Sequence, residues 1–184
     1  MPSGAFELSP FPGDPVSAGP LYDGVRLSGR ARRLGSVLAL DFHLVDPFAH
    51  VAWRKPDSPA ERRRGLWEHT CFECFLGPAD GDEYIECNLA PAGHWNVFRF
   101  DSYRAGMRDE PAFDALPVTV TARSDGLDLE VQLDAGRLGW TDVAWRLAVA
   151  TVLADRQGRC SYWALVHPAS QADFHDPRGF RFSL

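Results

Sequence analysis

The sequence lacks the positive charge that binding to nucleic acid requires. Its 184 residues carry 19 Lys and Arg side chains against 25 Asp and Glu, which gives a formal net charge of −6. The acidic residues are scattered along the chain, and basic side chains cluster only at residues 30–33 and 62–64. We therefore expect no nucleic-acid partner.

Long apolar runs are also missing. No stretch approaches the roughly 18 apolar residues that a membrane-spanning helix needs. The proline-rich residues 1–20 lack the basic start and apolar centre of a secretory signal. We therefore expect no membrane partner and a cytoplasmic location, whereas the sequence gives no indication of the oligomeric state.

Cysteine is scarce and shows no disulfide pattern. The four could make two disulfides, but an exported scaffold of this size would not depend on them, so we expect all four thiols to be reduced. Cys71 and Cys74 have the C-x-x-C spacing, but residues three apart in a strand point to opposite faces and would not converge on one metal ion. We interpret them as small apolar residues of a strand. The four are Cys71, Cys74, Cys87 and Cys160.

The sequence also lacks the common catalytic motifs and has few helical patterns. The sequence contains no G-x-S-x-G, P-loop, Rossmann fingerprint or H-E-x-x-H. Ser58-Pro59-Ala60-Glu61 has the form of a helix cap, but Gly65 follows so soon that it supports only one or two helical turns at residues 59–64.

The dominant pattern is a series of short strands separated by Gly, Pro, Asp and Asn. Several strands alternate apolar and polar residues, as in 127–133, which is typical of antiparallel sheets with one buried face. We predict an all-β fold, an antiparallel two-sheet β-sandwich, with an extended lead-in at residues 1–20 and one domain at residues 21–184. The predicted strands are 24–29, 36–44, 70–76, 83–89, 94–101, 118–123, 127–133, 145–153, 161–166 and 180–184.

Several separated motifs resemble one protein family. They are LWEHTCFECF at residues 66–75, YIECNLAPAGHWN at 84–96, YR at 103–104, SYWALVHP at 161–168 and DFH at 173–175. In this order they resemble the bacterial DOMON-like proteins, which are related to family 9 carbohydrate-binding modules, over residues 24–184. The resemblance implies a β-sandwich with relatives that bind sugars or haem. Two positions depart from the family pattern: Ala172, where proline often precedes Asp-Phe-His, and Ala154, where an acidic residue is common.

A candidate ligand site follows from the alternation of residues in two strands. Tyr84, Glu86 and Asn88 share one face, and a hairpin through residues 77–82 would place Glu73 beside Glu86. Two carboxylates and an amide suit hydrogen bonds to sugar hydroxyls, and they equally suit a hard cation such as Ca²⁺. The structural alternative is that both carboxylates are solvated or paired with an arginine, namely Arg99 or Arg104.

Aromatic residues could complete such a site, because flat rings pack against sugar rings. Trp67 and Trp95 adjoin turns or loops and are the candidates for a pocket mouth, whereas Trp163 is expected in the core. We expect the sheet face with Glu73 and Glu86 to be the ligand side. The complete set of predicted ligand residues is Glu73, Tyr84, Glu86, Asn88, Trp95, Trp67 and Arg104.

The leading hypothesis is a non-catalytic module that binds a carbohydrate or a sugar-like small molecule. Haem is an alternative that the resemblance suggests, because relatives use Met and His as axial ligands. A glycoside hydrolase using Glu73 and Glu86 is a further alternative, which depends on the separation of the two carboxyl groups. The possible haem ligands here are Met107 with His69, His94, His167 or His175.

The segment before the last strand contains a possible metal or acid–base cluster. His167, Asp173 and His175 all lie in this loop. Imidazole and carboxylate are common metal ligands, but loop histidines also hold loops through hydrogen bonds to backbone atoms. Both interpretations are open for His167, Asp173 and His175 at the level of sequence.

Overall fold

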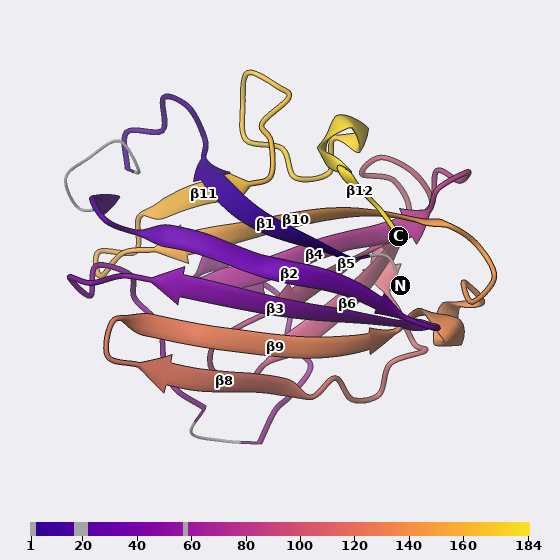
Figure 1. The fold of residues 1–184 in the computed structure, drawn as a ribbon, viewed down its shortest axis with the longest axis horizontal. Coiled ribbons are helices and arrows are strands. Elements are labelled where there is room, and N and C mark those ends of the chain that lie inside the picture. Colours follow the sequence, from indigo (N-terminus) through magenta and orange to yellow (C-terminus); the bar gives the residue numbers. More distant parts are fainter. Residues whose placement is uncertain (1–2, 17–21, 57–58) are drawn as a thin grey trace.

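The computed structural model describes residues 3–16, 22–56 and 59–184, which form a sandwich of antiparallel strands (Figure 1). Short 3-10 helices interrupt the strands, including η2 (Leu66–Glu68), η3 (Ala135–Leu138) and η4 (Pro177–Gly179). The described strands are β1 (Ser3–Pro10), β2 (Arg26–Leu34), β3 (Val37–Val45), β4 (Cys71–Pro78), β5 (Tyr84–Leu89), β6 (Trp95–Phe100), β7 (Arg108–Asp109), β8 (Val118–Arg123), β9 (Gly126–Asp134), β10 (Trp145–Ala154), β11 (Cys160–Ala164) and β12 (Phe182–Ser183).

The strands form two layers that are joined along one edge. One layer has the order β7-β6-β5-β4-β10-β11, with β12 also paired to β10, and the other has the order β1-β2-β3-β9-β8. Strand β1 joins them, because it pairs with β2 along most of its length and with β11 through Ser9 and Pro10. Figure 1 shows the β1–β2–β3–β9–β8 layer in front of the other. The predicted all-β antiparallel sandwich is confirmed.

Each of the ten predicted strands is present, with its ends shifted by a few residues. The sequence analysis missed β1 and β7. Strand β7 has only two residues, which is too short for any alternation to show. Strand β1 lies inside the predicted lead-in, where the surrounding prolines hid it. The division into residues 1–20 and 21–184 stays a prediction.

The short helix predicted at residues 59–64 is wrong, because these residues form no helix. Ser58, the first residue of the predicted cap, lies outside the described residues. The chain here runs extended along the edge of β6. The Trp95 amide donates to the Glu61 carbonyl at 3.1 Å, and the Arg63 amide donates to the Trp95 carbonyl at 2.9 Å. Pairing with an open sheet edge satisfies these backbone groups better than an isolated turn of helix would.

The sheet that contains β4, β5, β6 and β10 is buried on both faces. Its inner face packs into the main core between the layers, with Ile85, Cys87 and Leu89 contributed by β5 as predicted. Its outer face carries a second apolar cluster that includes Phe75 and Phe98. The segment between β11 and β12 covers this cluster with Phe174 and Phe180. Polar residues of the outer face are consequently buried.

The cysteines are all free, and three of them are buried. Cys74 lies in the main core opposite Cys87, whereas the Cys71 thiol lies 3.6 Å from Asn88 Oδ1 on the outer face. The two thiols of the C-x-x-C therefore point to opposite faces, as predicted. No helix in the described residues is long and apolar enough to cross a membrane.

Candidate functional site

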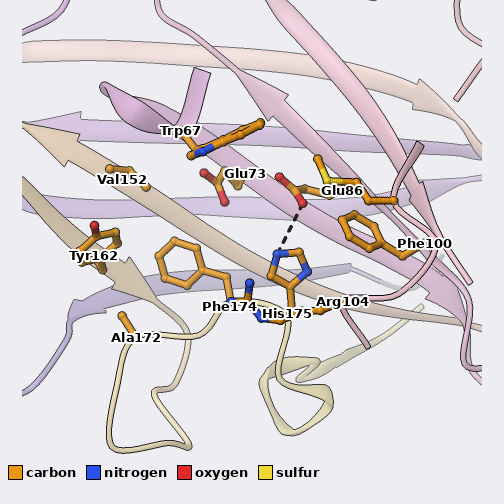
Figure 2. A pocket seen from close by; sticks show the side chains of 11 residues that line it. Trp67, Glu73, Glu86, Phe100, Arg104, Val152, Tyr162, Ala172, Phe174 and His175 are labelled. Carbon is orange, nitrogen blue, oxygen red and sulfur yellow. Dashed lines mark ion pairs between the residues drawn. The ribbon is translucent and has the colours of Figure 1, made fainter. Parts of the chain in front are cut away.

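A cavity of about 380 Å³ lies on the outer face of the β4–β5–β10 sheet, beneath the segment that precedes β12 (Figure 2). Glu73 and Glu86 form its floor, Trp67 stands on one side, and Phe174 and His175 close the opposite side. The lining residues are Trp67, Glu73, Glu86, Phe100, Arg104, Met107, Val152, Tyr162, Ala172, Phe174 and His175.

Glu73 is a buried carboxyl group with an unsatisfied oxygen. It lies in the middle of β4, and only 3% of its surface is exposed. Its Oε1 atom has no hydrogen-bond partner among the described residues. Burial, reinforced by the nearby Glu86 carboxyl, raises the pKa of Glu73 well above its usual value. An acceptor without a donor is costly in a protein interior, and such exceptions gather at functional sites.

Glu86 is held by a hydrogen bond to one of its oxygens. Asn88 lies two residues along β5 on the same face, and its Nδ2 donates to Glu86 Oε1 at 2.6 Å. The other oxygen, Oε2, faces His175 Nε2 at 3.6 Å. Burial raises the pKa of Glu86, against the opposing effects of the Asn88 hydrogen bond and the Arg104 charge. Asn88 is completely buried and holds Glu86 in place from beneath the cavity.

Tyr84 fixes the orientation of His175. The Arg104 amide donates to the Tyr84 hydroxyl oxygen at 3.2 Å, and that hydroxyl lies 2.8 Å from His175 Nδ1. The hydroxyl proton is then available to Nδ1, which leaves the Nε2 proton directed at Glu86. Burial, together with the Arg104 charge, lowers the pKa of His175 to about 4. The imidazole is therefore neutral at physiological pH.

We expect the His175 ring signals in NMR spectra to stay constant from about pH 8 down to about pH 5.5. The unfolded chain takes up a proton near its ordinary pKa of 6.5, whereas the folded ring does so near 4. The contribution of neutral His175 to the free energy of unfolding is consequently lost as the pH falls from about 6.5 to about 4. A His175→Asn variant assigns the signals, and a ring that titrates near pH 6.5 would contradict the buried neutral state.

Arg104 ties the loop between β6 and β7 to the segment before β12. Its backbone is left-handed, with φ of 53°, which is costly for a residue other than glycine. Its guanidinium donates to Asp173 Oδ1 at 2.7 Å, and the Tyr103 hydroxyl donates to Oδ2. Burial opposes the effect, but these hydrogen bonds hold the pKa of Asp173 below its usual value. The ionised pair closes one side of the cavity.

Aromatic rings form the walls. Trp67, on η2, is 36% exposed and packs edge-on against Phe98, with ring centroids 5.7 Å apart. Tyr162, on β11, is 40% exposed and meets Phe174 at 6.1 Å. Both rings are half-open to solvent beside a buried polar floor, so they offer flat apolar area to a bound molecule.

The structure gathers six of the seven predicted ligand residues at this cavity. Trp67, Glu73, Glu86 and Arg104 line it, and Tyr84 and Asn88 support it from beneath. The paired-arginine alternative does not hold for Glu73 and Glu86, because Arg104 bonds Asp173 and Arg99 bonds another acidic pair. The lining residues that the sequence did not indicate are Phe100, Val152, Tyr162 and Phe174.

Trp95 is the predicted ligand residue that the structure places elsewhere. It is 2% exposed and lies in the main core, where its ring packs under the Arg62 guanidinium at 4.6 Å. The hairpin register explains this position. Trp95 pairs with Leu89, so it shares the core-facing side with Leu89, whereas Asn88 faces outward. Trp163, predicted in the core, is there.

Of the two interpretations of His167, Asp173 and His175, the described residues support the structural one. His167 Nε2 contacts the Ser9 carbonyl at 2.9 Å, and its ring packs against Phe11, so it holds a loop. Asp173 bonds Arg104, and only His175 of the three lines the cavity. Within the described ranges, no group of three or more His, Cys, Asp or Glu side chains is arranged to hold a metal ion. Among the described residues that line the cavity, only Glu73 and Glu86 carry carboxyl groups, whereas Ca²⁺ takes about six to eight oxygen ligands.

Haem does not fit the side chains of this cavity. Met107 and His175 do line it together, which is the pair that axial ligation would need. However, His175 Nδ1 bonds the Tyr84 hydroxyl, and its Nε2 faces Glu86. Nδ1 is therefore engaged, and an iron at Nε2 would lie against the two carboxyl groups of the floor.

Comparison with known proteins places the fold beside carbohydrate-binding structures. No protein-family model matches the sequence, and no curated protein matches it. A proposed carbohydrate-binding protein of Bacteroides uniformis ATCC 8492 is similar over 96% of this chain and 84% of its own, with a TM-score of 0.69 and 11% identity. A family 9 carbohydrate-binding module of Caldicellulosiruptor kristjanssonii, in complex with glucose, is similar over 79% and 69%, with a TM-score of 0.50 and 10% identity. At these identities the likeness shows a shared fold.

Proposed function

We propose that the protein binds a carbohydrate or a sugar-like small molecule in the cavity above Glu73 and Glu86, and that it does so without catalysis. The observation that carries this proposal is the combination of a buried polar floor with half-exposed Trp67 and Tyr162 walls. Small-molecule sites have this composition, with apolar area for affinity and a few polar groups for orientation. The volume of about 380 Å³ suits a molecule of one or two sugar rings.

The fold neighbours support the same class of ligand. One is itself a proposed carbohydrate-binding protein, and the other is a carbohydrate-binding module with glucose bound. The motifs around Glu73 and Glu86 support membership of the bacterial DOMON-like proteins, which we propose together with a cytoplasmic location. Immunoblotting of the cytoplasmic and exported fractions of the source cells tests that location.

The arrangement of the two carboxyl groups favours binding over hydrolysis. A glycoside hydrolase needs two carboxyl groups that can both act on the ligand. Here Glu86 is bonded to Asn88 through one oxygen and faces His175 with the other. Both carboxyl groups lie side by side in the floor of the cavity, so they meet a ligand from the same side (Figure 2). Two carboxyl groups on one side of a sugar suit hydrogen bonds that orient it, whereas hydrolysis requires the pair to flank the scissile bond.

We expect Trp67→Ala to weaken sugar binding by about tenfold or more, because the truncation removes a flat wall of the cavity. Calorimetry with glucose, cellobiose and related sugars measures the effect. Phe48→Ala is the matched control, since Phe48 is exposed but lies away from this cavity. If no sugar binds the wild-type protein at millimolar concentration, the proposed function is wrong.

A further inference from the structure

We propose that the cavity selects ligands that carry a positively charged amino group, such as an amino sugar, and that it places the ammonium group against Glu73 and Glu86. This inference rests on the proposed function and specifies its ligand class. The geometry points to it because the floor offers a hydrogen-bond acceptor with no donor, and because Arg104, which lines the cavity, is already paired with Asp173.

The acceptor is Glu73 Oε1. It is buried, it lines the cavity, and no described residue donates a hydrogen bond to it. A neutral sugar hydroxyl could reach this oxygen, but a hydroxyl brings no opposite charge that would let the buried carboxyl group ionise. An ammonium group supplies both a donor and the opposite charge, and a charge-assisted hydrogen bond is about twice as strong as a neutral one.

The positive groups near the floor are already committed or neutral. Arg104 is bonded to Asp173, so that pair adds no net charge. His175 accepts from Tyr84 through Nδ1 and stays neutral. No ion pair joins Glu73 to a basic side chain in the residues that the structure describes. The titratable groups around Glu73 are Cys71 on β4, Glu86 on β5, Tyr162 on β11, Arg104 in the loop between β6 and β7, and Asp173 and His175 before β12.

The walls suit a cation as well as a sugar ring. The faces of Trp and Tyr rings attract cations through their electron-rich surfaces, most strongly when water is excluded. Trp67 stands beside the two carboxyl groups, with Phe100 and Phe174 nearby, and Tyr162 lines the cavity beyond Phe174 (Figure 2). Aromatic rings combined with carboxylates make a common recognition set for ammonium groups. A ligand that carries both a sugar ring and an amine would use the walls and the floor together.

Binding of an ammonium group should change the protonation of Glu73. In the empty cavity, burial and Glu86 raise the pKa of Glu73, which favours its protonated form. A bound ammonium favours the ionised form, so binding releases a proton and the affinity rises with pH. The rise is expected below about pH 7, where a sugar amine keeps its own charge. N-acetylglucosamine, whose nitrogen is uncharged, should show no such release.

The test compares glucosamine, N-acetylglucosamine and glucose by calorimetry near pH 6.5. We expect glucosamine to bind wild-type protein about tenfold or more tightly than N-acetylglucosamine. In Glu73→Gln this preference should fall to about threefold or less. Glu7→Gln is the matched control, because Glu7 is exposed on β1 and should leave the preference unchanged.

The outcomes separate this inference from the proposed function. If the neutral sugars bind as tightly as glucosamine, the inference fails and sugar binding stands. If none of the three ligands binds, both fail. If the preference survives in Glu73→Gln, the ammonium group is held elsewhere and the inference is overturned. Should the variant not fold, calorimetry of the wild-type protein in two buffers of different ionisation enthalpy decides, because glucosamine binding without proton release overturns the inference.

Discussion

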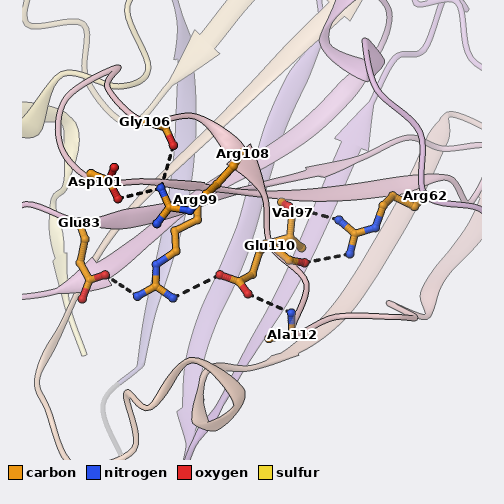
Figure 3. A network of polar contacts seen from close by, with 9 residues as sticks. All are labelled: Arg62, Glu83, Val97, Arg99, Asp101, Gly106, Arg108, Glu110 and Ala112. Carbon is orange, nitrogen blue, oxygen red and sulfur yellow. Dashed lines mark hydrogen bonds and ion pairs between the residues drawn. The ribbon is translucent and has the colours of Figure 1, made fainter.

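The Arg62→Ala variant is expected to lose about 3 kcal/mol or more of its free energy of unfolding. The Arg62 guanidinium donates hydrogen bonds to several buried acceptors that would otherwise need water (Figure 3). It donates to Asn96 Oδ1 at 2.8 Å and to the Glu110 carbonyl at 3.1 Å. Alanine would leave the Glu110 and Phe113 carbonyls without this donor and would uncover the Trp95 ring. The further acceptors are the carbonyl oxygens of Val97 and Phe113.

The loss should extend to the cavity wall. Residues 61–63 pair along the edge of β6, and Trp67 follows them on η2. Releasing this segment would therefore displace Trp67 as well as destabilise the fold. Urea denaturation measures the free energy of unfolding. Calorimetry of the folded variant measures the sugar affinity, which should fall if Trp67 is displaced.

Arg63→Ala is the neighbouring control for this experiment. The Arg63 guanidinium bonds Glu61 in a pair that is about half-exposed on both sides. Exposed ion pairs contribute little, so we expect a loss of less than about 1 kcal/mol. Equal losses in the two variants would show that Arg62 acts as an ordinary surface residue, in contradiction to the network around it.

Alternation along single strands was enough to predict which residues of the fold face the core. Strand β9 shows this, because its leucines alternate with charged residues and every apolar position is buried. The same rule placed Tyr84, Glu86 and Asn88 on one face of β5, as observed. Local spacing determines these features, so a single strand carries the signal.

Features that depend on how strands pair could not be read from spacing. Trp95 was misplaced because its face follows from the hairpin register with Leu89. Tyr162 reaches the cavity only because β11 pairs with β10 in the same sheet, and Phe174 only because the segment before β12 covers the outer face. The resulting burial also raises the pKa of Glu73, which alternation along β4 alone could not predict. Tertiary contacts of this kind leave no periodic trace in the sequence.

The separate roles of Glu86 and Asn88 lead to the second large effect. We expect Asn88→Ala to lose about 2–3 kcal/mol of the free energy of unfolding, because it leaves buried Glu86 Oε1 without its donor. Glu86→Ala should lose a similar amount, because it leaves the Asn88 amide unpaired. The double variant removes both partners of this bond, so its loss should be smaller than the sum of the two single losses.

Stability and binding together distinguish a structural from a ligand-binding residue at this site. Glu86 lines the cavity, whereas Asn88 lies beneath it and is completely buried. Glu86→Ala should therefore reduce both stability and sugar affinity. Asn88→Ala should reduce stability first and change affinity only through the displaced Glu86. Urea denaturation of all four proteins gives the coupling free energy, and strictly additive losses would show that the 2.6 Å contact between the two side chains contributes nothing. Wild-type stability in both variants, together with a loss of sugar binding, would contradict this assignment. It would require Asn88 to contact the sugar directly, although Asn88 is completely buried beneath Glu86.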